Sequence, residues 1–170
     1  MPKVSEEHLA NRKQQILDAA ANCFARNGFH RTSMQDIVKE AGLSAGLIYR
    51  YFTGKDDMIV AIVEERHTQR AASLAATDLT TGYLDLLRRI ASPDAARERN
   101  LSMQAWAETV RDPRIRELAK QGVDGPAKAG PLPESTVRVF IAIYQGLLLQ
   151  SSWDDTLDVD AFVDSVRALL

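Results

Sequence analysis

Apolar residues recur at helical spacing near the start of the chain. The repeating positions are Leu9, Ile16, Leu17, Ala20 and Phe24. Residues at this spacing share one face of a helix with 3.6 residues per turn. Gly28 follows the last of them, and glycine often ends a helix because it adopts the left-handed conformation without strain. The pattern predicts a first helix over residues 6–27.

Two shorter apolar repeats follow, separated by a glycine. The first consists of Met34, Ile37, Val38 and Ala41, and the second of Leu47, Ile48 and Phe52. Thr32 or Ser33 can cap the first helix and Ser44 the second. Gly42 suits the left-handed residue that ends the first of them. Two short helices joined by such a turn predict a helix-turn-helix, the shape that puts one helix into a DNA groove.

Helical spacing continues through most of the remaining chain. It predicts helices over residues 54–75, 80–90, 95–110, 114–121, 134–151 and 159–170. Asp56 and Asp57 fall in the first turn of the first of these, where negative charge favours the helix dipole. Residues 122–133, GVDGPAKAGPLP, hold so many glycines and prolines that a loop is expected. No segment alternates convincingly as a strand, so the predicted fold is all-α.

The composition is that of a soluble globular protein. With 170 residues, 45% hydrophobic and 26% charged, the chain can bury a sizeable core as one or two small domains. No apolar run approaches the roughly 20 residues that span a bilayer, and the N-terminus lacks the apolar centre of a secretory signal. We therefore expect a cytoplasmic protein with no membrane partner. The single Cys23 is expected to be a small buried thiol.

The net charge of −2 conceals an uneven distribution. Residues 1–55 carry eight Lys and Arg against five Asp and Glu, a net charge of +3. The remaining residues carry thirteen against eighteen, a net charge of −5. The basic surplus therefore coincides with the predicted helix-turn-helix, which weakly favours a DNA-binding head and an acidic body.

Three short motifs stand in order along residues 10–63. They read GFHRTS from Gly28, AGLSAGLIYRYF from Ala41 and GKD from Gly54. Together with ILDAAANCFARN before them, they resemble the TetR family of bacterial transcriptional regulators. The combination is far more specific than a helix-turn-helix pattern alone.

The resemblance implies two domains and a set of partners. Residues 1–56 would form a three-helix DNA-binding head, and residues 57–170 a helical ligand-binding and dimerisation body. The implied function is a ligand-responsive regulator, with repression the favoured sign. The implied partners are a double-stranded, palindromic DNA operator, a second copy of the chain, and a small apolar or amphipathic effector.

Several residues of the head are candidates for DNA contact. Small residues at the start of the second short helix allow close approach to bases, and hydroxyl, amide and cationic groups can bind phosphates or base edges. Residues at helix starts suit phosphate because free N–H groups point outward there. The candidates are Thr32, Ser33, Gln35, Ser44, Ala45, Gly46, Tyr49, Arg50, Tyr51 and Lys55. Gln35 is chosen by its position in the family motif; Ser44 can equally be only a cap, and Tyr51 only a core aromatic.

The body offers candidates for two further surfaces. Residues that can line a ligand cavity are Tyr83, Leu87, Met103, Trp106, Glu108, Val110 and Tyr144. Residues that can form a dimer interface on the last two helices are Phe140, Tyr144, Gly146, Leu147, Phe162, Val166 and Leu169. From the residues alone, each aromatic residue or methionine of the first set is more often core than pocket, and an intramolecular core explains the second set about as well as a dimer does.

Two other functional classes compete with a regulator. An enzyme is disfavoured because His8, His30 and His67 are scattered and no catalytic or nucleotide-binding motif is present. We expect no metal site and no cofactor. The second alternative is a helical ligand-binding or interaction module without DNA binding. Gly46, Tyr49, Arg50 and Lys55 argue against it, because a packing domain does not need this set.

Overall fold

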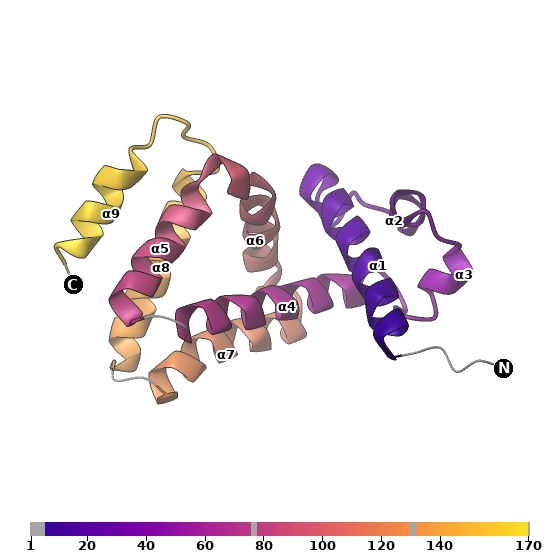
Figure 1. The fold of residues 1–170 in the computed structure, drawn as a ribbon, viewed down its shortest axis with the longest axis horizontal. Helices are drawn as coiled ribbons and strands as arrows, with labels where there is room; N and C mark the ends of the chain where they lie inside the picture. Colours follow the sequence, from indigo (N-terminus) through magenta and orange to yellow (C-terminus); the bar gives the residue numbers. More distant parts are fainter. Residues whose placement is uncertain (1–5, 76–77, 130–131, 170) are drawn as a thin grey trace. The chain divides into compact units, whose positions relative to one another are not determined.

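The computed structural model describes residues 6–75, 78–129 and 132–169, which are helical throughout apart from turns and connections (Figure 1). The chain forms two compact units, Met1–Val63, here called the head, and Glu64–Leu170, the body. The elements are α1 (Glu6–Asn27), α2 (Met34–Ala41), α3 (Ala45–Ile48), α4 (Lys55–Ala75), α5 (Leu79–Ala91), the 3₁₀ turn η1 (Pro93–Ala95), α6 (Ala96–Glu108), α7 (Pro113–Ala129), α8 (Glu134–Gln150) and α9 (Val159–Arg167). The described residues contain no strand, as predicted.

The head has its own core, formed where α1 packs on α2 and α2 on α3. Its fully buried side chains include Ile16, Phe24, Ile37, Ile48 and Met58. The rings of Phe24 and Phe29 meet edge to face with centroids 5.1 Å apart. The thiol of Cys23 is buried, as expected, and burial raises its pKa. These contacts fix the two short helices, which are too short to be stable alone.

The predicted helix ends of the head are confirmed. Gly28 and Gly42 have φ angles of 87° and 64°, the left-handed conformation that ends a helix. Ser33 caps α2 through a reciprocal box with Asp36, and the Ser44 hydroxyl accepts a hydrogen bond from the Leu47 amide at 3.3 Å. α4 begins at Lys55 and reaches Ala75.

The body is built around α5, which packs on both α8 and α9 (Figure 1). Its core consists of Tyr83, Leu84, Leu86, Leu87, Ile90, Ala91, Tyr144, Leu147, Leu148, Val163 and Val166. α6 and α7 also contact α8. Among the described residues, no helix is both long and apolar enough to cross a membrane.

The predicted loop over residues 122–133 is wrong for most of its length, because α7 continues to Ala129. The cluster of glycines and prolines suggests a break, but the helix runs through Gly122 and Gly125. A Cβ atom at Gly122 would lie 2.5 Å from Nε2 of His67, so the glycine lets α7 approach another side chain closely. Residues 130–131 lie outside the described part of the chain.

Candidate nucleic-acid interface

α3 exposes the small residues at its start and buries the opposite side. Ala45 and Gly46 are exposed, whereas Ile48 is fully buried. Helical hydrogen bonding continues past α3, since the Phe52 amide donates to the Ile48 carbonyl at 3.1 Å. The segment from Ser44 to Phe52 is therefore one compact helical unit with a small-residue tip.

Gly46 has no role inside the head. A Cβ built at this position meets no heavy atom within 4 Å, so the fold accepts alanine there without a clash. Glycine in a helix costs about 1 kcal/mol relative to alanine, so its presence needs a reason outside the head. A surface that must approach another molecule closely provides one.

Polar side chains follow this tip in the sequence and are also exposed on α2. The side chain of Tyr49 is 52% exposed, Arg50 is exposed, and Tyr51 is half-buried. On α2, Gln35 lies exposed in the first turn. The structure thus presents hydroxyl, amide and guanidinium groups beside a tip that a groove can admit.

Ser33 and Thr32, the two proposed caps of α2, differ in their surroundings. Ser33 is exposed; its amide donates to Oδ2 of Asp36 at 2.9 Å, and its hydroxyl at 2.7 Å. Both bonds lower the pKa of Asp36, and the bond from the Ser33 hydroxyl has the larger effect. Thr32 is 1% exposed and its hydroxyl donates to the Gly28 carbonyl at 2.8 Å. Its side chain ties the turn together, so the phosphate contact expected of it is not available.

Lys55 also makes contacts other than the expected one. Its Nζ donates to the backbone carbonyls of Phe29, His30 and Thr32 at 2.9, 3.2 and 3.2 Å. An ammonium has three donors, and here three carbonyls take them. Lys55 therefore fastens the turn after α1 to the start of α4, which disfavours the direct phosphate clamp expected from its position at a helix start.

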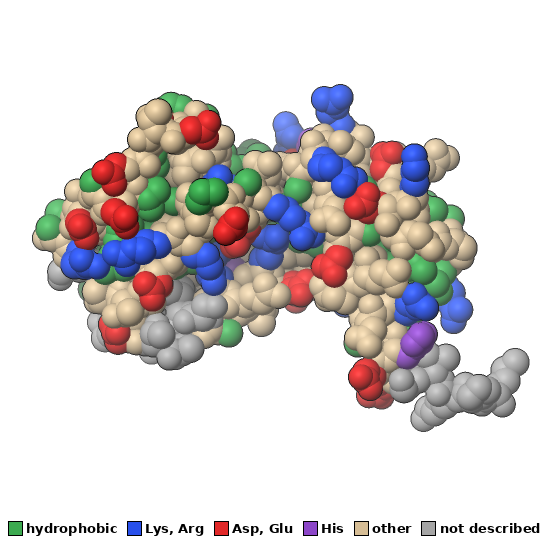
Figure 2. All heavy atoms as spheres, turned by 45° about the horizontal axis from the view of Figure 1, so that its top comes forward, with side chains coloured by type: hydrophobic (Ala, Val, Ile, Leu, Met, Phe, Trp, Pro, Cys, Tyr) green, Lys and Arg blue, Asp and Glu red, His purple; other side chains and the backbone are tan. Residues whose placement is uncertain are grey.

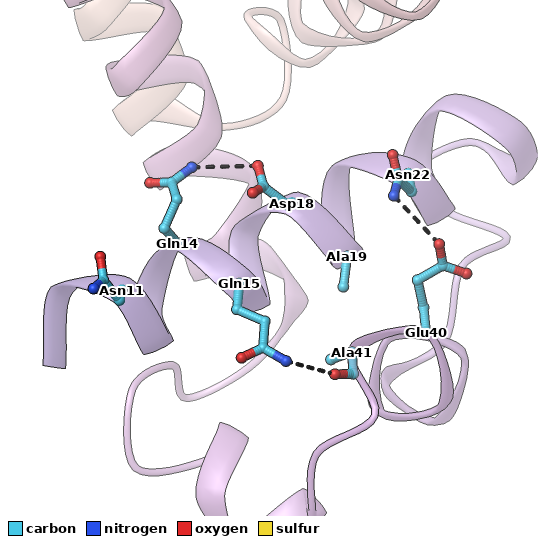
Figure 3. A pocket seen from close by; sticks show the side chains of 8 residues that line it. All are labelled: Asn11, Gln14, Gln15, Asp18, Ala19, Asn22, Glu40 and Ala41. Carbon is cyan, nitrogen blue, oxygen red and sulfur yellow. Dashed lines mark hydrogen bonds between the residues drawn. The ribbon is translucent and has the colours of Figure 1, made fainter. Parts of the chain in front are cut away.

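A polar groove lies between α1 and α2 (Figure 3). Its lining residues are Asn11, Gln14, Gln15, Asp18, Ala19, Asn22, Glu40 and Ala41. Gln15 donates to the Ala41 carbonyl at 3.0 Å and Asn22 to Glu40 at 3.3 Å, while Arg26 pairs with Glu40 at 2.7 Å. The groove is thus an inter-helix seam that positions α2, and sequence reasoning missed it because its pairs are far apart in the chain.

The candidate ligand residues of the body fall into three groups. Tyr83, Leu87 and Tyr144 belong to the buried core, and Met103 and Trp106 pack against it. Glu108 is half-buried and pairs with Arg111 at 3.4 Å. Val110 is 77% exposed, so the prediction that it lines a cavity is wrong. It stands in the turn after α6, where the helical face no longer continues.

The candidate dimer residues also differ in how deeply they are buried. Tyr144 and Leu147 lie within the body core, so they are not surface residues of the protomer. Phe140 and Phe162 are partly buried, Gly146 is half-buried, and Leu169 is 78% exposed. A shallow apolar groove on α8 and α9 is lined by Ser135, Thr136, Val139, Phe140, Ile143, Val166 and Leu169. Helix periodicity could not separate its inner and outer faces, because both are apolar.

Charge on the surface is mixed. On the face shown in Figure 2, acidic and basic side chains lie interspersed over both units, with apolar side chains exposed between them. The basic surplus of residues 1–55 is thus not gathered into one stripe on this face.

A capped helix-turn-helix with an exposed small-residue tip, followed by a separate helical body, defines a helix-turn-helix regulator. The signature described as "Bacterial regulatory proteins, tetR family" matches residues 16–62. The HTH-type transcriptional repressor AcnR of Corynebacterium jeikeium is 31% identical over 140 residues, which cover 72% of this chain and 73% of that protein. The chain belongs to the TetR family.

Two further comparisons agree. The HTH-type transcriptional repressor Rv1474c of Mycobacterium tuberculosis is 39% identical over 95 residues, covering 55% of this chain and only 49% of that protein. The solved structure of Salmonella enterica GusR superimposes with a TM-score of 0.75 at 25% identity, covering 98% of this chain and 96% of GusR. The likeness to AcnR and GusR thus extends into the body.

Proposed function

We propose that this protein is a transcriptional repressor that binds a palindromic operator as a homodimer and leaves it when a small molecule binds the body. The observation that carries the proposal is the exposed tip of α3, Ala45 and Gly46, where a Cβ atom at Gly46 would meet no other part of the head. Relatives named as repressors support the sign of regulation. A DNA-binding regulator acts in the cytoplasm, and we assign no catalytic role.

In this proposal α3 enters the major groove with its tip against the bases. Ser44, Ala45 and Gly46 permit close approach, and Tyr49 and Arg50 bind phosphates or base edges behind them. Gln35, Ser33 and the Tyr51 hydroxyl, which belong to the same head, make supporting contacts to the DNA. Lys55 acts indirectly, because its bonds to the 29–32 turn hold α2 and α4 together.

The groove on α8 and α9 is the proposed dimer surface. Val139 is 57% exposed and Leu169 78%, and both border the groove. Apolar side chains exposed on adjoining helices are typical of a surface that another chain covers. A two-fold pair of bodies would present two heads, which matches a palindrome of two half-sites.

The proposed effector binds next to Met103 and Trp106, the partly buried side chains on the body core. It acts by binding one arrangement of the dimer more tightly than the other, since a ligand with equal affinity for both shifts nothing.

Selection of bound sequences from random DNA tests this function. A palindromic site should emerge, and fluorescence anisotropy should then show affinity falling with salt at a log–log slope of about 0.9 per neutralised phosphate. Tyr49→Ala should weaken binding by about tenfold, equal to about 1.4 kcal/mol, and Tyr49→Phe separates the ring from the hydroxyl. A helical module without DNA binding would enrich no sequence and show no such slope.

A further inference from the structure

A group of polar side chains within the body core lacks partners. Tyr144 on α8 is 4% exposed, and its hydroxyl finds no hydrogen-bond partner among the described residues. The guanidinium carbon of Arg70 on α4 lies 4.9 Å from the centroid of the Tyr144 ring. Nε of Arg70 is also buried without a partner in the described part of the chain. Arg66 lies one turn earlier on α4, on the same helical face.

Most of the charged side chains that act on this group are positive. Those that act on Arg66 and Tyr144 belong to Arg70, Arg89, Arg97 and Glu98. Counted with Arg66, these are four guanidinium groups and one carboxylate. Burial, and then the like charges of Arg97 and Arg70, lower the pKa of Arg66, while Glu98 opposes the shift. An arginine stays charged at neutral pH even so.

An internal role explains only part of this arrangement. A cation above an aromatic ring is a stabilising contact and accounts for Arg70 beside Tyr144. It does not account for the buried Nε and hydroxyl, because an unpaired polar group in a core costs about 1–3 kcal/mol. Nor does it account for Arg66, since Arg66 forms no ion pair within the described residues.

The neighbouring helix connects this group to the aromatic side of the core. Burial raises the pKa of Tyr144 most, Arg70 lowers it, and the Ser102 hydroxyl lies close enough to lower it further without an aligned hydrogen bond. Ser102 and Trp106 are four residues apart on α6, so they share a face. Trp106 therefore stands one helical turn from the polar group.

We propose that the effector is a small organic anion whose carboxylate or phosphate group binds Arg66, Arg70 and the Tyr144 hydroxyl, with its apolar part directed toward Trp106. Planar guanidinium groups bind both anions through paired N–H donors, and the phenol adds another. The anion would neutralise part of the buried positive charge and satisfy the orphaned donors. This inference rests on the proposed effector response and names its chemical class.

Binding is tested on the full chain without DNA, using three probes with the same six-carbon tail: heptanoate, hexyl phosphate and hexanol. Trp153→Phe removes the other tryptophan, which is 69% exposed, so fluorescence reports on Trp106. At least one anion is expected to bind about tenfold or more tightly than hexanol, and the better anion identifies carboxylate or phosphate. Equal binding of all three, or no binding of either anion, overturns the proposal.

Variants locate the site. Arg66→Met and Arg70→Met keep an apolar stem but remove the charge, and each should weaken anion binding about tenfold without changing hexanol binding. Tyr144→Phe should weaken it less and raise the Tm of the free protein, because it removes a buried hydroxyl without a partner. Arg114→Met is the matched control on the exposed start of α7. If folded Arg66→Met, Arg70→Met and Tyr144→Phe all bind the anion as wild type does, the site is wrong.

The operator is measured separately. An anion that binds but does not release the operator would contradict the proposed regulation and leave the anion site standing. A protein that releases its operator only with uncharged molecules, and binds no anion, would keep the regulator and refute the site.

Discussion

Replacing Gly46 by alanine is expected to change stability and DNA affinity in opposite directions. The new Cβ meets no atom within 4 Å, so it adds no clash inside the head. Alanine in a helix is favoured over glycine by about 0.5–1 kcal/mol. For a chain of this length that corresponds to a Tm increase of about 1–4 °C. Because the tip faces the groove in our proposal, the same methyl group should weaken operator binding by about tenfold or more.

Thermal unfolding followed by circular dichroism and anisotropy with the selected operator measure the two effects on one sample. Gly125→Ala is the matched control, because Gly125 is also helical and also open at its Cβ, but lies in the body. It should raise stability similarly and leave operator affinity unchanged. Wild-type affinity for Gly46→Ala would refute close approach of the tip to DNA, and a lowered Tm would refute the absence of an internal role for the glycine.

Three further predictions concern other parts of the molecule. Lys55→Met should lower the free energy of unfolding by about 1–3 kcal/mol, because three carbonyls lose their donor; urea titration checks this, and exposed Lys39→Met should have little effect. Val139→Asp and Leu169→Asp should shift the protein toward monomer in sedimentation velocity and weaken operator binding, and an unchanged dimer would refute the α8–α9 surface. Asp36, whose pKa in the fold is lowered below its ordinary value of 3.8 by bonds from Ser33, stabilises the head fully above that value and loses this effect as the pH falls through the lowered pKa. Asp36→Asn should therefore be less stable than wild type at about pH 6, with a smaller difference at about pH 3.

Local signals predicted the head almost completely. Gly28, Ser33, Gly42 and Ser44 each act on residues within four positions, so their types alone indicate where helices begin and end. The same holds for the start of α4. Secondary structure that depends on neighbours along the chain is readable from the sequence.

Contacts between distant residues were not predictable in this way. Lys55 reaches carbonyls 23 to 26 residues earlier, which no periodicity indicates. α7 continues to Ala129 and brings Gly122 close to His67, although local composition favours a loop. Leu147 is expected at the dimer surface, and Tyr144 there and in the ligand cavity, but both lie in the body core, since apolar type does not reveal which helix lies opposite.

The exposed tip of α3 has no packing role within the head. Ala45 and Gly46 are exposed, and a Cβ atom at Gly46 meets no other atom, so folding constrains these positions little. The mutations that a protein tolerates are limited mainly by how much each one destabilises the fold. If the tip reads the operator as we propose, single changes there can alter operator preference without crossing that limit, so duplicated copies of such a gene can acquire different targets while keeping one scaffold.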